Sequence, residues 1–188
     1  TLMRESMVRA PVPTRAEVSD VYNAVEDGAD AVMLSAETAS GKYPRRAVDI
    51  MERIIRTSES LIPERNPDDY DSDGETISEI IGHLVYSACA EFRQAGFEGG
   101  KIVCFTHSGL SARMISKYRP DLPVLGITSD MRTAREMRLL WGVDPVPIAD
   151  VDELDNTMDR IVRSVSVCAR QAKVSGGEKL VVAGNFFD

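Results

Sequence analysis

Residues 101–113 read KIVCFTHSGLSAR. The first five residues are mostly apolar and include β-branched side chains, so they predict a buried strand at Lys101–Phe105. Hydroxyl side chains and a glycine follow, and apolar residues at helical spacing then run from Ser111 to Tyr118. A strand that leads directly into a helix is the repeating unit of α/β domains, in which the strands lie parallel in one sheet.

The same alternation of strands and helices continues on both sides of this stretch. Short apolar runs predict further strands, and apolar residues at helical spacing predict further helices. Residues 75–188 are therefore predicted to form an α/β domain with a mostly parallel sheet. The further strands are expected at Val124–Thr128, Val143–Ile148 and Leu180–Ala183, and the further helices at Glu75–Ala95, Thr133–Leu140 and Val151–Lys173.

Residues 1–62 have a different pattern. Thr14 and Glu17 have the spacing of a capping box, which predicts the start of a helix. ADAVMLS, residues 29–35, predicts a short strand buried on both faces, and Pro44 is placed to begin a second helix. A single buried strand has no partner within this stretch. Either a partner supplies the missing strands, or the chain is a fragment of a larger fold.

The segment between the two halves is polar. Residues 63–74 read PERNPDDYDSDG, which is acidic, contains proline and is almost free of aliphatic side chains. Such a segment buries too little apolar surface to offset the entropy lost when a chain becomes ordered. It is predicted to be a linker.

The overall composition excludes several classes of protein. The chain has 188 residues, 43% of them hydrophobic, and a formal net charge of −8, which disfavours diffuse binding to nucleic acid or to an anionic membrane surface. No apolar run approaches the roughly 20 residues that a membrane-spanning helix needs. Cys89, Cys104 and Cys168 have apolar neighbours and no metal-ligand spacing, as expected for reduced thiols. A soluble, cytoplasmic protein is predicted.

The loop after the strand at Lys101–Phe105 is the strongest candidate binding site. Thr106, Ser108, Gly109 and Ser111 stand where the strand passes into a helix. Unpaired N–H groups at a helix N-terminus and nearby hydroxyl groups bind phosphate, and a glycine allows close approach. Serine and threonine also cap helices that bind nothing, so the alternative is an ordinary helix cap.

A second group of polar residues follows the apolar run at residues 29–35. Glu37 lies directly after this run, close to Ser35, in the position where α/β proteins place reactive groups. The alternative is a loop carboxylate that caps the next helix. His83 and His107, the two histidines, lie far apart without ligand spacing, so neither a metal site nor a histidine-based triad is predicted. His107 could contact an anion bound at the neighbouring loop.

Several longer stretches share a resemblance to one known family. They are TLMRESM at 1–7, PTRAEVSDVYNAV at 13–25, DGADAVMLSAETASGKYP at 27–44, THSGLSAR at 106–113, YRP at 118–120, PVLGIT at 123–128 and TAR at 133–135. Together they resemble the pyruvate kinase family. The resemblance covers most of the chain, except for the linker and the last third of the C-terminal half.

The resemblance implies a fold and domain organisation. Residues 1–62 would be the last strand and helices of a (β/α)8 TIM barrel, the catalytic domain of that family, with its other strands absent from this chain. Residues 75–188 would be the family's C-terminal α/β effector-binding domain. The orphan strand at residues 29–35 would then be the eighth strand of the barrel.

The resemblance also implies an activity. The family transfers a phosphoryl group from phosphoenolpyruvate to ADP with Mg²⁺ and K⁺, and the metal ligands and the catalytic lysine would lie in barrel segments upstream of this chain. Thr1, Ser35 and Glu37 would belong to the network that delivers a proton to the enolpyruvate. Thr106, Ser108, Gly109 and Ser111 match the family's effector-phosphate loop. Members of the family are typically homotetramers, and this portion alone is expected to be inactive.

Two other functions remain open from the sequence. One is a stand-alone phosphosugar-binding regulatory module, because such modules also use a serine-rich turn between strand and helix. This alternative gives no role to residues 1–62. The other is a purely structural element of an assembly, in which every hydroxyl group of the loop is a helix cap.

Overall fold

The computed structural model describes residues 5–61, 76–97 and 99–184. The chain divides into two compact units, Thr1–Arg65 and Asn66–Asp188. The predicted linker at residues 63–74 lies outside the described residues. No helix in the described ranges is both long enough and apolar enough to cross a membrane.

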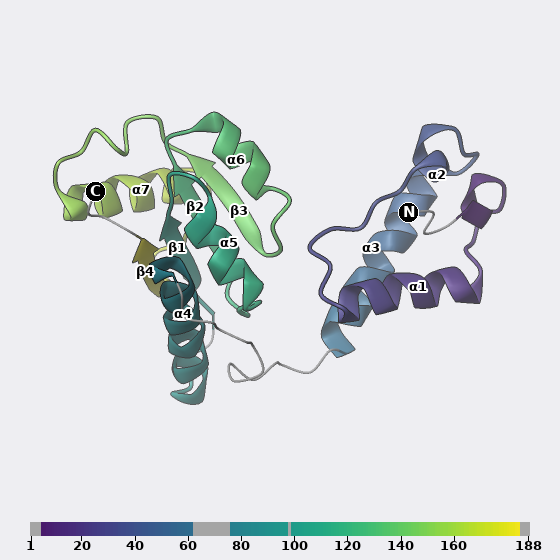
Figure 1. The fold of residues 1–188 in the computed structure, drawn as a ribbon, viewed down its shortest axis with the longest axis horizontal. Coiled ribbons are helices and arrows are strands. Elements are labelled where there is room, and N and C mark those ends of the chain that lie inside the picture. Colours follow the sequence, from purple (N-terminus) through teal and green to yellow (C-terminus); the bar gives the residue numbers. More distant parts are fainter. Residues whose placement is uncertain (1–4, 62–75, 98, 185–188) are drawn as a thin grey trace. The chain divides into compact units, whose positions relative to one another are not determined.

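The described part of the first unit is helical (Figure 1). Thr14 and Glu17 form the predicted capping box, and Pro44 is the first residue of the second long helix, as predicted. The two long helices pack against each other. The helices are η1 (Glu5–Val8, a 3-10 helix), α1 (Arg15–Glu26), α2 (Ala36–Ala39) and α3 (Pro44–Leu61). The buried apolar residues are Met7, Val21, Ala47 and Met51.

The strand predicted at Ala29–Ser35 is absent. Residues 31–35 have no regular secondary structure, and the Met33 side chain is 55% exposed. A β-strand is held by hydrogen bonds to a neighbouring strand, and residues 5–61 contain no strand that could supply them. The prediction of a strand was therefore wrong for this chain. The loop expected after it contains the short helix α2.

The second unit contains a four-stranded, fully parallel sheet. The strand order is β3-β2-β1-β4, so the chain moves outward from β1 to β3 and then returns to the other side of β1. The predicted α/β domain with a parallel sheet is thus confirmed. The strands are β1 (Lys101–Phe105), β2 (Val124–Thr128), β3 (Val143–Pro147) and β4 (Leu180–Gly184).

Helices cover both faces of this sheet. Residues of α4, α5 and α6 pack with Ile102 and Cys104 of β1 in one core, whereas residues of α7 pack with Val103 and Phe105 in the other. Parallel crossovers are right-handed, so reversing the direction of strand addition moves the connecting helix to the opposite face. The helices are α4 (Ile77–Gln94), α5 (Leu110–Lys117), α6 (Met131–Met137) and α7 (Thr157–Arg170).

One helix boundary differs from the sequence prediction by several residues. The last helix begins at Thr157 rather than at Val151, because Asn156 is its N-cap and accepts a hydrogen bond from the Met158 N–H at 2.8 Å. Residues 151–156 instead form turns that follow β3. This places Asp152 in a loop at the carboxyl end of the sheet.

The three cysteines are free and buried, as predicted. Burial raises the pKa of Cys104 to about 12. Burial, with a contribution from the Asp121 carboxylate, raises the pKa of Cys89 to about 11. Both side chains therefore stay as neutral thiols near neutral pH and behave as small apolar core residues.

Candidate functional site

The loop after β1 has the geometry of an anion-binding turn. Gly109 adopts a left-handed conformation with φ 82°, and its N–H donates a hydrogen bond to Thr106 Oγ1 at 3.0 Å. Gly109 is the N-cap of α5 and, having no side chain, leaves the N–H groups of the first turn uncapped. The hydroxyl of Thr106 thus shapes the turn, and the N–H groups of the helix remain available to a ligand.

The loop opens into a cavity of about 450 Å³ at the carboxyl end of the sheet. Three of the four predicted phosphate-binding residues line it, and Gly109 sits between them as the helix cap. Ligands of α/β proteins with parallel sheets bind at this end, beyond the carboxyl ends of the strands, and Phe105 of β1 and Ile127 of β2 line the cavity here. The lining residues are Ser78, Phe105, Thr106, His107, Ser108, Leu110, Ser111, Ile127, Val151, Asp152 and Arg160.

Ser111 is the most buried of the predicted hydroxyl groups. Its side chain lines the cavity, and the residue is only 9% exposed. Within residues 5–61, 76–97 and 99–184, its hydroxyl group makes no hydrogen bond. The Ser111 oxygen does not belong to the fully buried, unpaired side-chain atoms of the described residues, so it is accessible from the cavity and can donate a hydrogen bond to a ligand there.

Arg160 is a cavity residue that the sequence did not reveal. It belongs to α7, on the opposite face of the sheet from α5, and about 50 residues of sequence separate it from the predicted phosphate-binding loop at Thr106–Gly109. Its Nε donates to the Leu154 carbonyl at 2.7 Å and its Nη2 to the Asp152 carbonyl at 3.3 Å. An arginine has five N–H donors, so the side chain retains donors for an anion in the cavity.

His107 also lines the cavity, as expected for a residue beside the loop. Its side chain is 85% exposed, and its Nδ1 lies 3.8 Å from Asp152 Oδ2. Ser129, which follows β2, donates a short hydrogen bond to the same Asp152 oxygen. Asp152 therefore contacts side chains from the loops after β1 and β2, neither of which is near it in the sequence.

Ser35 and Glu37 lie together in the first unit. Ser35 is the N-cap of α2 without a side-chain capping bond, and its backbone N–H donates to Glu37 Oε2 at 2.8 Å. Glu37 is fully buried. This bond places the buried carboxylate at the N-terminus of α2, the short helix that contains Glu37. Thr1, the third predicted catalytic residue, lies outside the described residues.

Gly41 completes the turn around Glu37. A Cβ atom at this position would lie 2.4 Å from the Glu37 carbonyl oxygen, so only glycine fits. The next residue, Lys42, donates its N–H to the Val8 carbonyl of η1 at 3.0 Å. The backbone around the buried carboxylate is therefore fixed from both sides.

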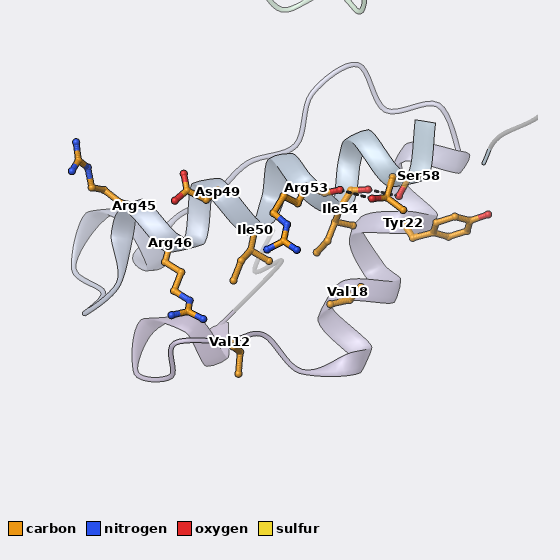
Figure 2. Close-up of a pocket in the computed structure, with 11 residues that line it drawn as sticks. Val12, Val18, Tyr22, Arg45, Arg46, Asp49, Ile50, Arg53, Ile54 and Ser58 are labelled. Carbon is orange, nitrogen blue, oxygen red and sulfur yellow. Dashed lines mark hydrogen bonds between the residues drawn. The ribbon is translucent and has the colours of Figure 1, made fainter. Parts of the chain in front are cut away.

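A larger groove of about 810 Å³ lies between α1 and α3 and contains none of the predicted site residues. Figure 2 shows Val18 of α1 and Ile50 and Ile54 of α3 along the groove, with Arg46 and Arg53 beside them. The Ser58 hydroxyl donates to the Ile54 carbonyl within α3 at 2.8 Å. The groove is an apolar helix–helix surface with a basic edge, not a cluster of groups suited to acid–base chemistry.

Among the described residues, no group of three or more His, Cys, Asp and Glu side chains could hold a metal ion.

Two family models match the chain. "Pyruvate kinase, alpha/beta domain" matches residues 83–186, and "Pyruvate kinase, barrel domain" matches residues 1–48. A pyruvate kinase of Agrobacterium vitis is 42% identical over 170 residues, covering 87% of this chain and 34% of that protein. A pyruvate kinase of Clostridium acetobutylicum is 37% identical over 188 residues, covering 97% of this chain and 37% of that protein.

Solved structures give the same result. A crystal structure of a pyruvate kinase from Cryptosporidium parvum superposes with a TM-score of 0.83 at 28% identity, covering 97% of this chain and 36% of that chain. The Cryptosporidium parvum pyruvate kinase in complex with ADP superposes with a TM-score of 0.78 at 28% identity, covering 98% of this chain and 36% of that chain. The chain spans about a third of the length of these proteins.

Proposed function

Because the chain belongs to the pyruvate kinase family, we propose that it forms the C-terminal part of an enzyme that transfers a phosphoryl group from phosphoenolpyruvate to ADP, giving pyruvate and ATP. Its first unit would complete the catalytic barrel, and its α/β unit would bind a phosphorylated effector. The observation that carries the second part is the cavity in which the phosphate loop and Arg160 meet.

The effector phosphate would bind at the first turn of α5. The N–H groups of that turn and the hydroxyls of Ser108 and Ser111 would donate to the phosphate oxygens, and the helix dipole adds partial positive charge. Arg160 would supply a full positive charge from α7. An effector held there would favour one conformation of the barrel, which makes the binding allosteric.

A double substitution tests this site. Ser108→Ala with Ser111→Ala removes two hydroxyl donors and keeps the backbone turn, so the affinity for a sugar phosphate or a nucleoside monophosphate should fall about tenfold or more. Isothermal titration calorimetry on the complete chain would measure it. Thr157→Ala, an exposed hydroxyl outside the cavity, is the matched control. An unchanged affinity in the double variant would refute the site.

Ser35 and Glu37 would act in protonating the enolpyruvate. A hydroxyl group is too weak an acid to give up its proton alone near neutral pH. Ser35 and Thr1 would instead orient a water molecule, and the Glu37 carboxylate would hold the charge of the network. The support in the structure is the 2.8 Å hydrogen bond that fixes the Glu37 carboxylate beside Ser35.

The rest of the catalytic machinery would come from outside this chain. The family uses Mg²⁺ and K⁺, which neutralise the phosphates, and the ligands of these ions would lie in barrel segments upstream of this chain. The chain alone would be inactive. The complete enzyme would be a cytoplasmic homotetramer.

A stand-alone phosphosugar-binding module is the second candidate function. It is favoured by the α/β unit, which has its own core on each face of the sheet. It leaves the helices of the first unit without a role, although they match the family's barrel domain. Discovery that the native polypeptide is no longer than this chain would favour the module.

A further inference from the structure

The phosphate cavity contains a carboxylate that a simple anion site would not need. Asp152 lines the cavity together with the phosphate loop, and its side chain is 52% exposed. A negative charge in this position opposes the binding of anions in general. Its presence therefore limits which anions the cavity accepts.

The neighbours of Asp152 keep its carboxylate in place. Ser129 donates to Oδ2, and Arg160 binds the Asp152 backbone carbonyl at 3.3 Å. His107 Nδ1 lies 3.8 Å from Oδ2. Side chains from two loops thus contact the carboxylate, and Arg160 of α7 holds the Asp152 backbone. The second carboxylate oxygen makes no hydrogen bond within residues 99–184.

We propose that Asp152 determines the ligand class of this cavity: a phosphate monoester whose body carries hydroxyl groups, and not a ligand with a second phosphate near Asp152. This inference rests on the proposed effector site. One phosphate would occupy the turn at Ser108 and Ser111, and a hydroxyl group of the ligand body would donate to the carboxylate of Asp152. A second phosphate would meet that carboxylate as a like charge.

The shape and lining of the cavity agree with such a ligand. Its volume of about 450 Å³ is at the lower end of the range typical of small-molecule sites. Phe105, Ile127 and Val151 add apolar surface to the lining of the cavity. Among the lining residues that the structure describes, Arg160 alone has a side chain with a permanent positive charge, which matches a single phosphate group better than two.

The test compares two probes that differ by one phosphate group, fructose 6-phosphate and fructose 1,6-bisphosphate. Calorimetry on the full chain at low ionic strength, where charge repulsion is least screened, would give both dissociation constants. The wild-type chain should bind the monophosphate at least about fivefold more tightly. Asp152→Asn should strengthen bisphosphate binding about fivefold and remove the preference, because the repulsion of one unit charge is lost. Adenosine monophosphate, as a third probe, would show whether the hydroxylated body is a hexose or a ribose.

Two further variants keep the result interpretable. Asp152→Glu retains the charge and should retain the preference, and Asp155→Asn removes an exposed charge that does not line the cavity and should have no effect. The role of Asp152 would be overturned if the wild-type chain bound both probes with equal affinity and Asp152→Asn left both affinities unchanged. If Ser108→Ala with Ser111→Ala still weakened the binding of both probes, the effector site itself would stand. Binding of no probe would overturn both.

Discussion

At the scale of single residues, Glu17 shows how one side chain organises the start of a unit. Its carboxylate accepts hydrogen bonds from the backbone N–H of Ser6 at 2.8 Å and from that of Thr14 at 2.7 Å. Partial burial raises the pKa of Glu17, but the bonds from Ser6 and Thr14 outweigh this and lower it from 4.5 to about 2. The ionised form is therefore the one that joins η1 to the first turn of α1.

This lowered pKa predicts a pH-dependent stability. A carboxylate with a depressed folded-state pKa contributes its full stabilisation above the unfolded value of 4.5 and loses it as the pH falls through about 2. Glu17→Gln should cost about 1 kcal/mol at pH 7. The difference in the free energy of unfolding between Glu17→Gln and the wild-type chain should shrink as the pH falls from 4.5 toward 2. Urea unfolding followed by circular dichroism would measure it.

Asp20→Asn is the control, because Asp20 is an exposed carboxylate on the same helix. It should change the free energy of unfolding little, both at pH 7 and at low pH. If the free energies of unfolding of the wild-type chain and of Glu17→Gln differed by the same amount from pH 7 to pH 2.5, the ionised carboxylate would not stabilise the first unit.

At the scale of elements, α4 and α5 of the second unit pack closely against each other. Gly82 of α4 lies against the backbone of Met114, and a Cβ atom at Gly82 would be 2.8 Å from the Met114 carbonyl oxygen. It would also lie 3.1 Å from the Tyr118 ring, which is fully buried. The absence of a side chain at Gly82 therefore sets the separation of these helices, and α5 carries the phosphate loop at its start.

Gly82→Ala tests this contact. Alanine favours a helix over glycine by about 1 kcal/mol, but the added methyl group would force the helices apart, at a cost of about 1–3 kcal/mol. The net result should be a less stable chain in urea unfolding and weaker phosphate binding. Gly176→Ala, where a Cβ atom meets nothing within 4 Å, should leave both unchanged. A more stable Gly82→Ala chain would contradict the close packing.

At the scale of the whole molecule, the main prediction concerns the rest of the enzyme. The native polypeptide should have a mass well above 20.7 kDa, because the chain spans about a third of its relatives' length. Intact-mass spectrometry would measure it. The longer protein should convert phosphoenolpyruvate and ADP in a coupled assay, whereas the 188-residue chain should show no turnover. A native mass of 20.7 kDa, or turnover by the short chain, would refute this.

The complete enzyme also allows a test of Glu37. Glu37→Gln keeps the shape of the buried side chain and removes its charge, so a role in the proton relay predicts a fall in kcat of about 10²-fold or more with little change in KM. The rate of enolpyruvate protonation, followed by solvent-isotope exchange, should fall in parallel. A variant that changes only stability would indicate that Glu37 acts solely as the cap of α2.

The sequence by itself determined the elements of the α/β unit and the resemblance to the family. Apolar runs and helical spacing depend on neighbours in the chain, so β1 and β2 appear at their predicted residues, and the capping box at Thr14 appears as predicted. The prediction failed at residues 29–35, because a strand exists only when another strand accepts its hydrogen bonds.

Only the tertiary structure decided what surrounds the phosphate loop. Ser108 and Ser111 were predicted from one short stretch of sequence. Arg160, in contrast, comes from α7 on the other face of the sheet, and Asp152 comes from the loop after β3. The strand order brings these residues together, and that order is set by the packing of helices on two faces, not by any pattern within a single segment. Local sequence fixes which groups can form a site, but long-range packing decides which charges meet there.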